Sequence, residues 1–222
     1  MLTVACVLRS GGIYDASWVA RLRDGVARHL RMEHRFVCLS DVDVPCERIP
    51  LEHDWPSWWA KIELFKLPGP VLYFDLDTAI VGDLTDIAKA AQSHQFCILR
   101  DFYRGGDGFG SGVMAWCSDD ASFVYDKFIV SPALFMVMCR DGGDQRYLEF
   151  VFDRSKAARW QDVTPRQFVS FKVHCQAAKS VPNGARVVCF HGQPKTLELS
   201  WLYDSVSDSA RRDALPTVQC GL

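Results

Sequence analysis

The residues that stand out for chemistry are two carboxylates one residue apart, Asp75 and Asp77, at the end of a short apolar run. The run, residues 71–74, is rich in aromatic side chains and follows Pro68-Gly69-Pro70, so we expect a buried strand there. Because side chains alternate along a strand, both carboxylates would leave the same side and would repel each other unless solvent or a cation separates them. In open α/β sheets, ligands collect outside the carboxyl ends of the strands. The pattern therefore indicates a paired-aspartate metal site.

The alternative for the same pair is a strand that simply ends in two solvated turn residues, since Asp is common where strands stop. On residue type and spacing alone, the two interpretations of Asp75 and Asp77 are about even.

The segments before this pair predict an α/β fold. Residues 3–8 form an apolar strand, and residues 9–14 form a loop at its carboxyl end. The next segment has apolar residues at helical spacing, and Asp15 or Ser17 can cap it. A second strand follows at residues 35–39 and ends in Ser40-Asp41. The order strand, helix, strand favours parallel neighbours in one sheet.

The later segments continue the same alternation. Residues 57–65 predict a helix that leads into the strand before Asp75, and residues 83–86 carry a helix-start signal. Further expected elements are a strand at 96–99, a glycine-dense loop at 105–110, a strand at 111–116, a helix at 119–129 with Phe123 and Phe128 inward, a helix opened by residues 142–145, and strands at 168–173 and 186–190.

Three polar residues near these elements each have an ordinary and a functional interpretation. Lys61 is most simply a solvated side chain, but it lies on a helix beside the expected anion site. Asp144 could serve only as the N-cap of its helix. A lone histidine is usually structural, yet His191 directly follows a buried strand and would sit at the ligand edge of the sheet.

Composition excludes several functional classes. The chain has 222 residues, about half of them hydrophobic, and a formal net charge of −2, with no basic block for nucleic-acid binding. No apolar run is long enough to span a bilayer, and residues 1–8 predict a first strand, not a signal peptide. The nine cysteines are scattered without a Cys-x-x-Cys pair, which favours buried thiols in a reducing cytosol over a zinc site or a disulfide framework. We therefore expect a cytoplasmic protein. Peripheral attachment to a membrane-bound acceptor stays open, although no basic amphipathic stretch supports it.

Four segments together resemble glycosyltransferase family 8, which includes glycogenin and bacterial lipopolysaccharide galactosyl- and glucosyltransferases. The resemblance spans roughly residues 3–200, and the motifs occur in the family's order. They are Tyr73-Phe74-Asp75-Leu76-Asp77-Thr78 for the Asp-x-Asp segment, Gly110-Ser111-Gly112-Val113-Met114 for an Asn-Ser-Gly-Val-Met strand, Gly143-Asp144-Gln145 for an Asp-Gln helix start, and Phe190-His191-Gly192-Gln193-Pro194-Lys195 for the closing His-Phe-x-Gly-x-x-Lys-Pro-Trp motif.

The resemblance implies a single-domain GT-A fold, an α/β architecture with a mostly parallel mixed sheet flanked by helices. It implies a glycosyltransferase that uses a nucleotide-diphosphate sugar, most often a UDP-sugar, with Mn²⁺ or Mg²⁺, and that retains anomeric configuration. The metal ligands would be Asp75, Asp77 and His191, and the residues facing the reactive side of the sugar would be Asp144 and Gln145. Donor contacts would come from Arg9, Tyr14, Ser40, Asp41, Lys61, Phe74, Leu76, Ser111, Gly192 and Lys195.

The chemistry of these residue types agrees with that implication. Carboxylate oxygens with one imidazole suit Mn²⁺ or Mg²⁺ better than a thiolate-preferring metal. The hard step of glycosyl transfer is expulsion of a diphosphate, and a divalent ion with a nearby lysine stabilises the charge that develops on it. The acceptor, whether saccharide, lipid-linked or protein, is not identified by the sequence, nor is any obvious nucleophile.

Two positions depart from the family pattern. Gly110 stands where the family usually has Asn, and Thr196-Leu197 follows Lys195 in place of Pro-Trp. The chain is also short for this family. We expect the transferase domain to occupy residues 1–205 and a polar tail to occupy residues 206–222.

Two other functions compete with transfer. A degenerate transferase would bind a nucleotide sugar without turnover, which the departures at Gly110 and Leu197 motivate. A haloacid-dehalogenase-like phosphatase would use Asp75 as nucleophile and Asp77 as acid and base. Against the phosphatase, that strand is normally close to the N-terminus and is usually followed by Gly-Thr, whereas a complete strand-helix-strand unit precedes it here.

Overall fold

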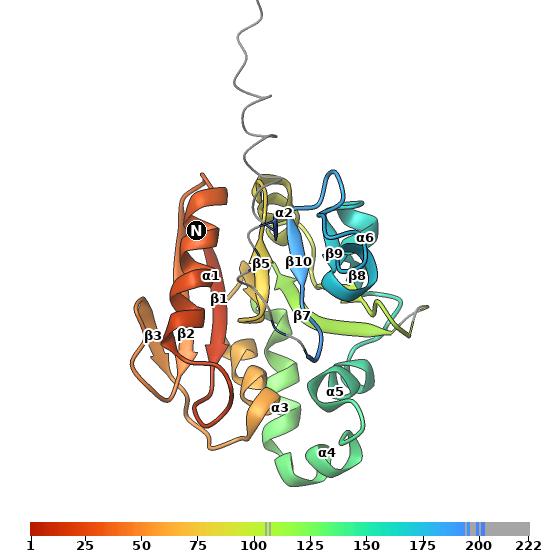
Figure 1. Cartoon of the computed structure of the whole chain (residues 1–222). Coiled ribbons are helices and arrows are strands. Elements are labelled where there is room, and N and C mark those ends of the chain that lie inside the picture. Colours follow the sequence, from red (N-terminus) through yellow and green to blue (C-terminus); the bar gives the residue numbers. More distant parts are fainter. Residues whose placement is uncertain (105, 107, 194, 196–198, 200, 203–222) are drawn as a thin grey trace, which may run out of the picture.

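The computed structural model describes residues 1–202 except 105, 107, 194, 196–198 and 200 (Figure 1). The strands are β1 (Leu2–Leu8), β2 (His34–Ser40), β3 (Glu47–Pro50), β4 (Val71–Phe74), β5 (Thr78–Ile80), β6 (Cys97–Arg100), β7 (Phe109–Trp116), β8 (Ala158–Arg159), β9 (Phe168–Ser170) and β10 (Val187–Cys189). The α-helices are α1 (Ala16–His29), α2 (Thr85–Ala91), α3 (Phe123–Ile129), α4 (Pro132–Met138), α5 (Gly143–Val151) and α6 (Trp160–Val163). The described residues also contain two 3₁₀ helices, η1 (Ser57–Lys66) and η2 (Asp119–Ser122), and one short π-helix, η3 (Phe171–Cys175).

The main sheet has seven strands in the order β3-β2-β1-β4-β7-β6-β8. Strand β7 runs antiparallel to both of its neighbours, β4 and β6, and the other neighbouring strands are parallel. A second sheet of three strands, β5-β10-β9, follows the end of β4. The expected α/β fold with a mostly parallel mixed sheet is confirmed.

Two apolar layers cover the two faces of the main sheet because the strands alternate strictly. In β4, Leu72 and Phe74 join the cluster that includes α1 and α2, whereas Val71 and Tyr73 join the cluster that includes η1, α3 and α5. All four side chains are buried, so β4 is a central strand with neither face exposed to solvent. The polar residues that follow β4 therefore emerge at the edge of a fully packed sheet.

Helix caps and cysteines follow local chemistry. Asp15 caps α1 by accepting a hydrogen bond from the Ser17 amide at 2.9 Å, as expected for an N-cap aspartate. The cysteines that lie in apolar strands, among them Cys6 and Cys189, are free and buried, and no disulfide joins the described residues. The described part of the chain also contains no single helix that is long and apolar enough to cross a bilayer. The tail expected at residues 206–222 lies outside the described residues.

Some expected elements differ from the structure. The helix expected at 119–129 is divided into η2 and α3, and Phe123, expected inward, is exposed, whereas Phe128 is buried. The strand expected at 168–173 ends at Ser170, where the Ser170 hydroxyl accepts from the Val173 amide and starts η3. These differences arise where a short polar side chain or a tertiary contact competes with local periodicity.

Candidate functional site

Asp75 is placed by the antiparallel pairing of β4 with β7. Its amide donates to the Gly112 carbonyl at 2.8 Å, and its own carbonyl accepts from the Thr78 amide at 3.1 Å, which turns the chain toward β5. The Asp75 carboxylate accepts hydrogen bonds from Lys61 Nζ at 3.3 Å and from the Tyr73 hydroxyl. A Cβ atom at Gly112 would lie 3.5 Å from Asp75 Oδ2, so the absence of a side chain there leaves room beside the carboxylate.

Asp77 is buried, with 5% of its surface exposed, which rules out the interpretation as a solvated turn residue. Its Oδ2 atom accepts from the Tyr14 hydroxyl at 3.0 Å and forms an ion pair with Lys195. Burial and the nearby Asp75 charge raise the pKa of Asp77 above its usual value, although Lys195 opposes them. An additional cation beside Asp77 would therefore stabilise the ionised form of its carboxylate.

Lys61 is the buried cation at the same edge, contrary to its ordinary interpretation as a solvated side chain. Its Nζ atom lies 2.7 Å from Asp144 Oδ2 and also donates to Ser111 Oγ at 3.0 Å. Burial alone would lower the pKa of Lys61, but the Asp144 and Asp75 carboxylates outweigh it and raise that pKa. Lys61 therefore stays charged and links η1, β4, β7 and α5 at one point.

Asp144 is not the N-cap of α5, because Gly142 occupies that position and makes no side-chain cap. Asp144 is buried in the first turn and faces Lys61, while Gln145 beside it is half-buried. The helix that carries both residues is anchored by a buried carboxylate, Glu149. It accepts from the Phe109 amide at 2.9 Å, and Arg104, Arg146 and Arg154 form ion pairs with it. The glycine-dense loop before β7 is thereby tied to α5.

Gly143 shows how closely α5 approaches η1. Its φ is +58°, and a Cβ atom there would lie 2.3 Å from Trp58 Nε1. We expect Gly143→Ala to lower the free energy of unfolding by about 1–3 kcal/mol, from the left-handed backbone and the displaced indole. Urea denaturation would measure this, with Gly12→Ala as the matched control, because no atom lies within 4 Å of a Cβ placed at Gly12 and its φ is not positive. Equal stability of both variants would contradict the close packing of Gly143 on Trp58.

His191 follows β10 and lies against two aromatic rings. Its ring centroid is 5.2 Å from that of Phe102 and 5.6 Å from that of Tyr103. The Nε2 atom is buried and has no hydrogen-bond partner among the described residues. Burial lowers the pKa of His191, so the imidazole is neutral at pH 7. A neutral ring with an unused buried nitrogen is the form in which histidine binds a metal.

The residues expected to bind a metal fit a divalent cation by type, but their side chains do not form a ligand cluster in this structure. Among residues 1–202, with the gaps given above, no three His, Cys, Asp or Glu side chains are grouped closely enough to hold an ion. Asp77 is instead paired with Lys195, and Asp75 with Lys61. The Asp75 charge acts to raise the pKa of Asp77 and also acts to raise that of His191, so Asp75 lies close enough to each of them to interact electrostatically.

A second polar group lies at the carboxyl ends of β1 and β2. Arg9 Nη1 lies 3.0 Å from Asp41 Oδ2, and Arg9 Nη2 lies 3.2 Å from Asp54 Oδ1. Asp41 also accepts from the Ser10 amide at 2.8 Å and from the Ser10 hydroxyl. Burial acts to raise the pKa of Asp41, but the Ser10 hydrogen bonds and the Arg9 charge outweigh it and lower that pKa. Arg9, Ser10 and Asp41 therefore form one connected polar group, here called the Arg9–Asp41 group.

Other expected donor contacts have different surroundings. The side chains of Phe74 and Leu76 belong to the apolar core, so only their backbone faces the site edge. Ser40 is fully buried, and its hydroxyl accepts from the Val42 amide at 3.1 Å. Gly192 is exposed, with φ of +60°.

Gly110 lies where the resembling family has Asn. A Cβ there would lie 3.2 Å from Leu99 Cβ, so a larger side chain would have to displace Leu99.

Sequence reasoning missed two site residues. Tyr73 donates its hydroxyl to Asp75, and Ser10 holds Asp41. The period of two along β4 was the available signal for Tyr73, because residues two apart share a side of the strand. Ser10 lies inside the loop at residues 9–14 that the family resemblance places near the nucleoside, but it was not singled out as a site residue.

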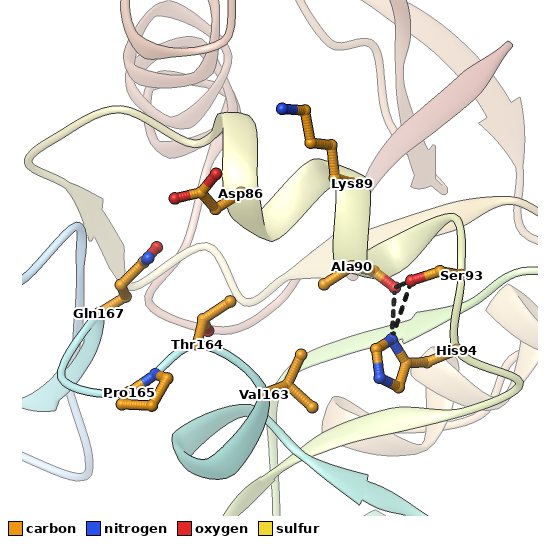
Figure 2. Close-up of a pocket in the computed structure, with 9 residues that line it drawn as sticks. All are labelled: Asp86, Lys89, Ala90, Ser93, His94, Val163, Thr164, Pro165 and Gln167. Atoms are coloured by element: carbon orange, nitrogen blue, oxygen red, sulfur yellow. Dashed lines mark hydrogen bonds between the residues drawn. The ribbon is translucent and has the colours of Figure 1, made fainter.

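A surface hollow between α2 and the segment 163–167 is separate from this edge. Figure 2 shows its lining residues, among them Lys89, His94 and Gln167. None of the candidate site residues lines it, so the hollow has no role in the arrangement described above.

No known family model matches the chain, and no curated protein matches it in sequence. Solved structures do match. The glycosyltransferase GlyE of Streptococcus pneumoniae aligns with a TM-score of 0.68 and 15% identity over 97% of this chain and 62% of that one. An active-site mutant of LgtC aligns with a TM-score of 0.61 and 14% identity over 97% and 98% of the two chains. The galactosyltransferase LgtC in complex with donor and acceptor sugar analogues aligns with a TM-score of 0.59, 14% identity and 97% of each chain.

At these identities the likeness concerns the fold. The chain spans about three fifths of GlyE and nearly the whole of LgtC. The expected GT-A architecture is confirmed, because both neighbours are glycosyltransferases of that fold.

Proposed function

We propose that this chain is a metal-dependent glycosyltransferase that moves a sugar from a nucleotide-diphosphate sugar, a UDP-sugar, to an acceptor, with retention of configuration. The observation that carries the proposal is the meeting of Lys61, Asp144, Ser111 and Asp75 at one sheet edge. Residues from four elements converge there on a fold that known glycosyltransferases share. Membership of glycosyltransferase family 8 is part of the same proposal, and so is the cytoplasmic location.

The proposed metal site consists of Asp75, Asp77 and His191. Its donors are two carboxylates and one neutral imidazole whose buried Nε2 has no partner among the described residues. A bound Mn²⁺ or Mg²⁺ would supply Lewis-acid stabilisation of the departing diphosphate. For the three donors to converge, Lys195 must leave Asp77, and its ammonium would then be free to contact the diphosphate.

Asp144 and Gln145 are proposed to face the sugar. The Asp144 carboxylate is neutralised by Lys61 at 2.7 Å, which makes it a poor nucleophile and a good acceptor for sugar hydroxyls. Gln145 offers an amide that can both donate and accept. The Arg9–Asp41 group and Tyr14 lie on the side of β1 and are proposed to hold the nucleoside.

Thermal unfolding with UDP, with Mn²⁺ and with both tests the proposal. A ligand at about 100 times its Kd stabilises the folded state by about 2.7 kcal/mol, which should raise Tm by roughly 5–10 °C in a chain of this size. We expect the full shift only with both components and its loss in EDTA. If UDP, GDP, CDP and TDP all fail with Mn²⁺ and Mg²⁺, the transferase proposal is wrong and phosphatase substrates come next.

His191→Ala separates a metal ligand from a structural histidine. Removing a residue that only hydrogen-bonds to a metal ligand typically lowers metal affinity about 10–100-fold. Removing a ligand itself should therefore weaken Mn²⁺ binding at least about tenfold. The fold should persist, because no described partner is left without its hydrogen bond. Isothermal titration with Mn²⁺ in the presence of UDP measures the affinity. Unfolding of the variant, or unchanged affinity, would remove His191 from the metal site.

A binding protein without turnover is the second candidate, and Gly110 supports it, because the Asn side chain of the resembling family is missing there. Such a protein would show the same thermal shift but no Mn²⁺-dependent release of UDP from a UDP-sugar. Release of UDP would exclude it.

A further inference from the structure

Lys172 is a half-buried cation that has no partner of its own beside the candidate site. Among the residues that the structure describes, its ammonium forms no hydrogen bond and no ion pair. The other two lysines at this edge are both paired, since Lys61 contacts Asp144 and Lys195 contacts Asp77. The edge therefore contains one positive charge that no carboxylate of the described residues neutralises.

The pairing of β9 with β10 places Lys172 beside His191. The two strands are parallel, their last residues are paired with each other, and they lie side by side in Figure 1. Each strand is followed by a phenylalanine, and the rings of Phe171 and Phe190 stack with their centroids 4.4 Å apart. Lys172 and His191 come directly after these rings. Both residues therefore follow the carboxyl ends of neighbouring strands, where ligands collect in α/β sheets.

The Lys172 ammonium faces the backbone next to His191. A Cβ atom at Gly192 would lie 3.5 Å from Lys172 Nζ, and Gly192 is exposed, so the missing side chain leaves room beside the ammonium. Burial is the largest cause of the lowered pKa of His191, and the ammonium groups of Lys195 and Lys172 act in the same direction. Two lysines therefore lie within electrostatic reach of the imidazole that is proposed to bind the metal.

We propose that Lys172 binds the diphosphate of the nucleotide donor, as a second cation beside Lys195. The proposal rests on the proposed function, because it adds a residue to the binding of the same donor. Phosphate oxygens accept strong charge-assisted hydrogen bonds from an ammonium group. The charges at the edge favour this ligand. Asp75 and Asp77 are already countered by Lys61 and Lys195, so Lys172 and a bound divalent cation add positive charge that a nucleoside diphosphate offsets.

Isothermal titration of the full chain with UDP in the presence of Mn²⁺ tests this contact. Lys172→Met removes the charge and keeps most of the apolar stem, and Lys172→Arg keeps the charge. Lys179→Met removes an equal charge from an exposed position elsewhere. We expect Lys172→Met to weaken UDP binding about tenfold, the effect of losing one charge-assisted hydrogen bond. Lys172→Arg should stay within about threefold of the parent, and Lys179→Met within about twofold.

Mn²⁺ titrated without nucleotide should give the opposite result. The Lys172 ammonium repels a cation at His191, so Lys172→Met should bind Mn²⁺ alone as tightly as the parent or more tightly. A variant that had only lost its fold would bind both ligands more weakly. The thermal midpoint without ligand should match that of the parent, because the substitution leaves no described partner unpaired.

Unchanged UDP affinity in Lys172→Met, or an equal loss in Lys172→Arg or Lys179→Met, would overturn the contact while the proposed function stands. If the parent binds no nucleotide with either metal, the proposed function fails. Inorganic pyrophosphate with Mg²⁺ then tests Lys172 separately, since this probe has the diphosphate and lacks the nucleoside. Binding by the parent that weakens about tenfold in Lys172→Met would support the diphosphate contact. Equal binding by the two, or none by the parent, would overturn it.

Discussion

Lys61→Met is expected to lower the free energy of unfolding by about 3–5 kcal/mol, the usual cost of breaking a buried ion pair by removing one partner. Lys61 is buried and lies 2.7 Å from Asp144, so the variant leaves that carboxylate in the core without its cation. Asp75 loses a second contact, at 3.3 Å, but is partly open to solvent and contributes less. Urea denaturation at pH 7 measures the change.

Two further variants make the Lys61 result specific. Lys66→Met alters the same helix, where Lys66 pairs with Glu52 at the surface, and should cost no more than about 1 kcal/mol. Asp144→Asn added to Lys61→Met removes the unpaired charge and should recover part of the lost stability. If Lys61→Met is as mild as Lys66→Met, the ion pair at the sheet edge does not stabilise the fold.

The second large effect is expected for Asp77→Asn, on activity and not on stability. Removing a metal ligand takes away several kcal/mol of transition-state stabilisation, which corresponds to at least about a 1,000-fold loss of rate. The Asn side chain keeps the shape and can still accept from Tyr14, and the parent carboxylate already has a raised pKa from burial, so the fold should persist. The measurement is Mn²⁺-dependent release of UDP from a UDP-sugar.

Asp126→Asn is the matched control for Asp77, because Asp126 is exposed on α3 away from the candidate site. We expect it to match the parent in UDP release and in thermal shift. If Asp77→Asn binds UDP and Mn²⁺ as tightly as the parent does, the metal assignment is wrong.

A binding titration would also show whether Lys195 competes with the metal. Lys195 occupies Asp77 in this structure, so its ammonium must be displaced when a cation binds. Lys195→Met would remove that competitor, although it would also remove the proposed diphosphate contact. The variant should therefore bind Mn²⁺ alone no more weakly than the parent, while UDP with Mn²⁺ binds more weakly.

Local sequence determined the elements that form the sheet edge. The apolar run before Asp75 predicted β4, because a short buried strand needs apolar side chains on both faces. The strand-helix-strand order at the N-terminus predicted the parallel pairing of β1 with β2. The motifs that resemble glycosyltransferases predicted the GT-A fold, which the structural neighbours confirm. Periodicity is sufficient for such features because each depends on residues close together in the chain.

Tertiary structure alone decided which charges meet. Lys61 and Asp144 have no local reason to pair, and each had an ordinary explanation as a solvated lysine or a helix cap. They meet because η1 and α5 pack on the same face of the sheet, and burying either charge without its partner would destabilise the fold. The burial of Asp77 between Tyr14 and Lys195 was likewise decided by packing. Local patterns assign side chains to faces, but only the assembled fold determines what each face touches.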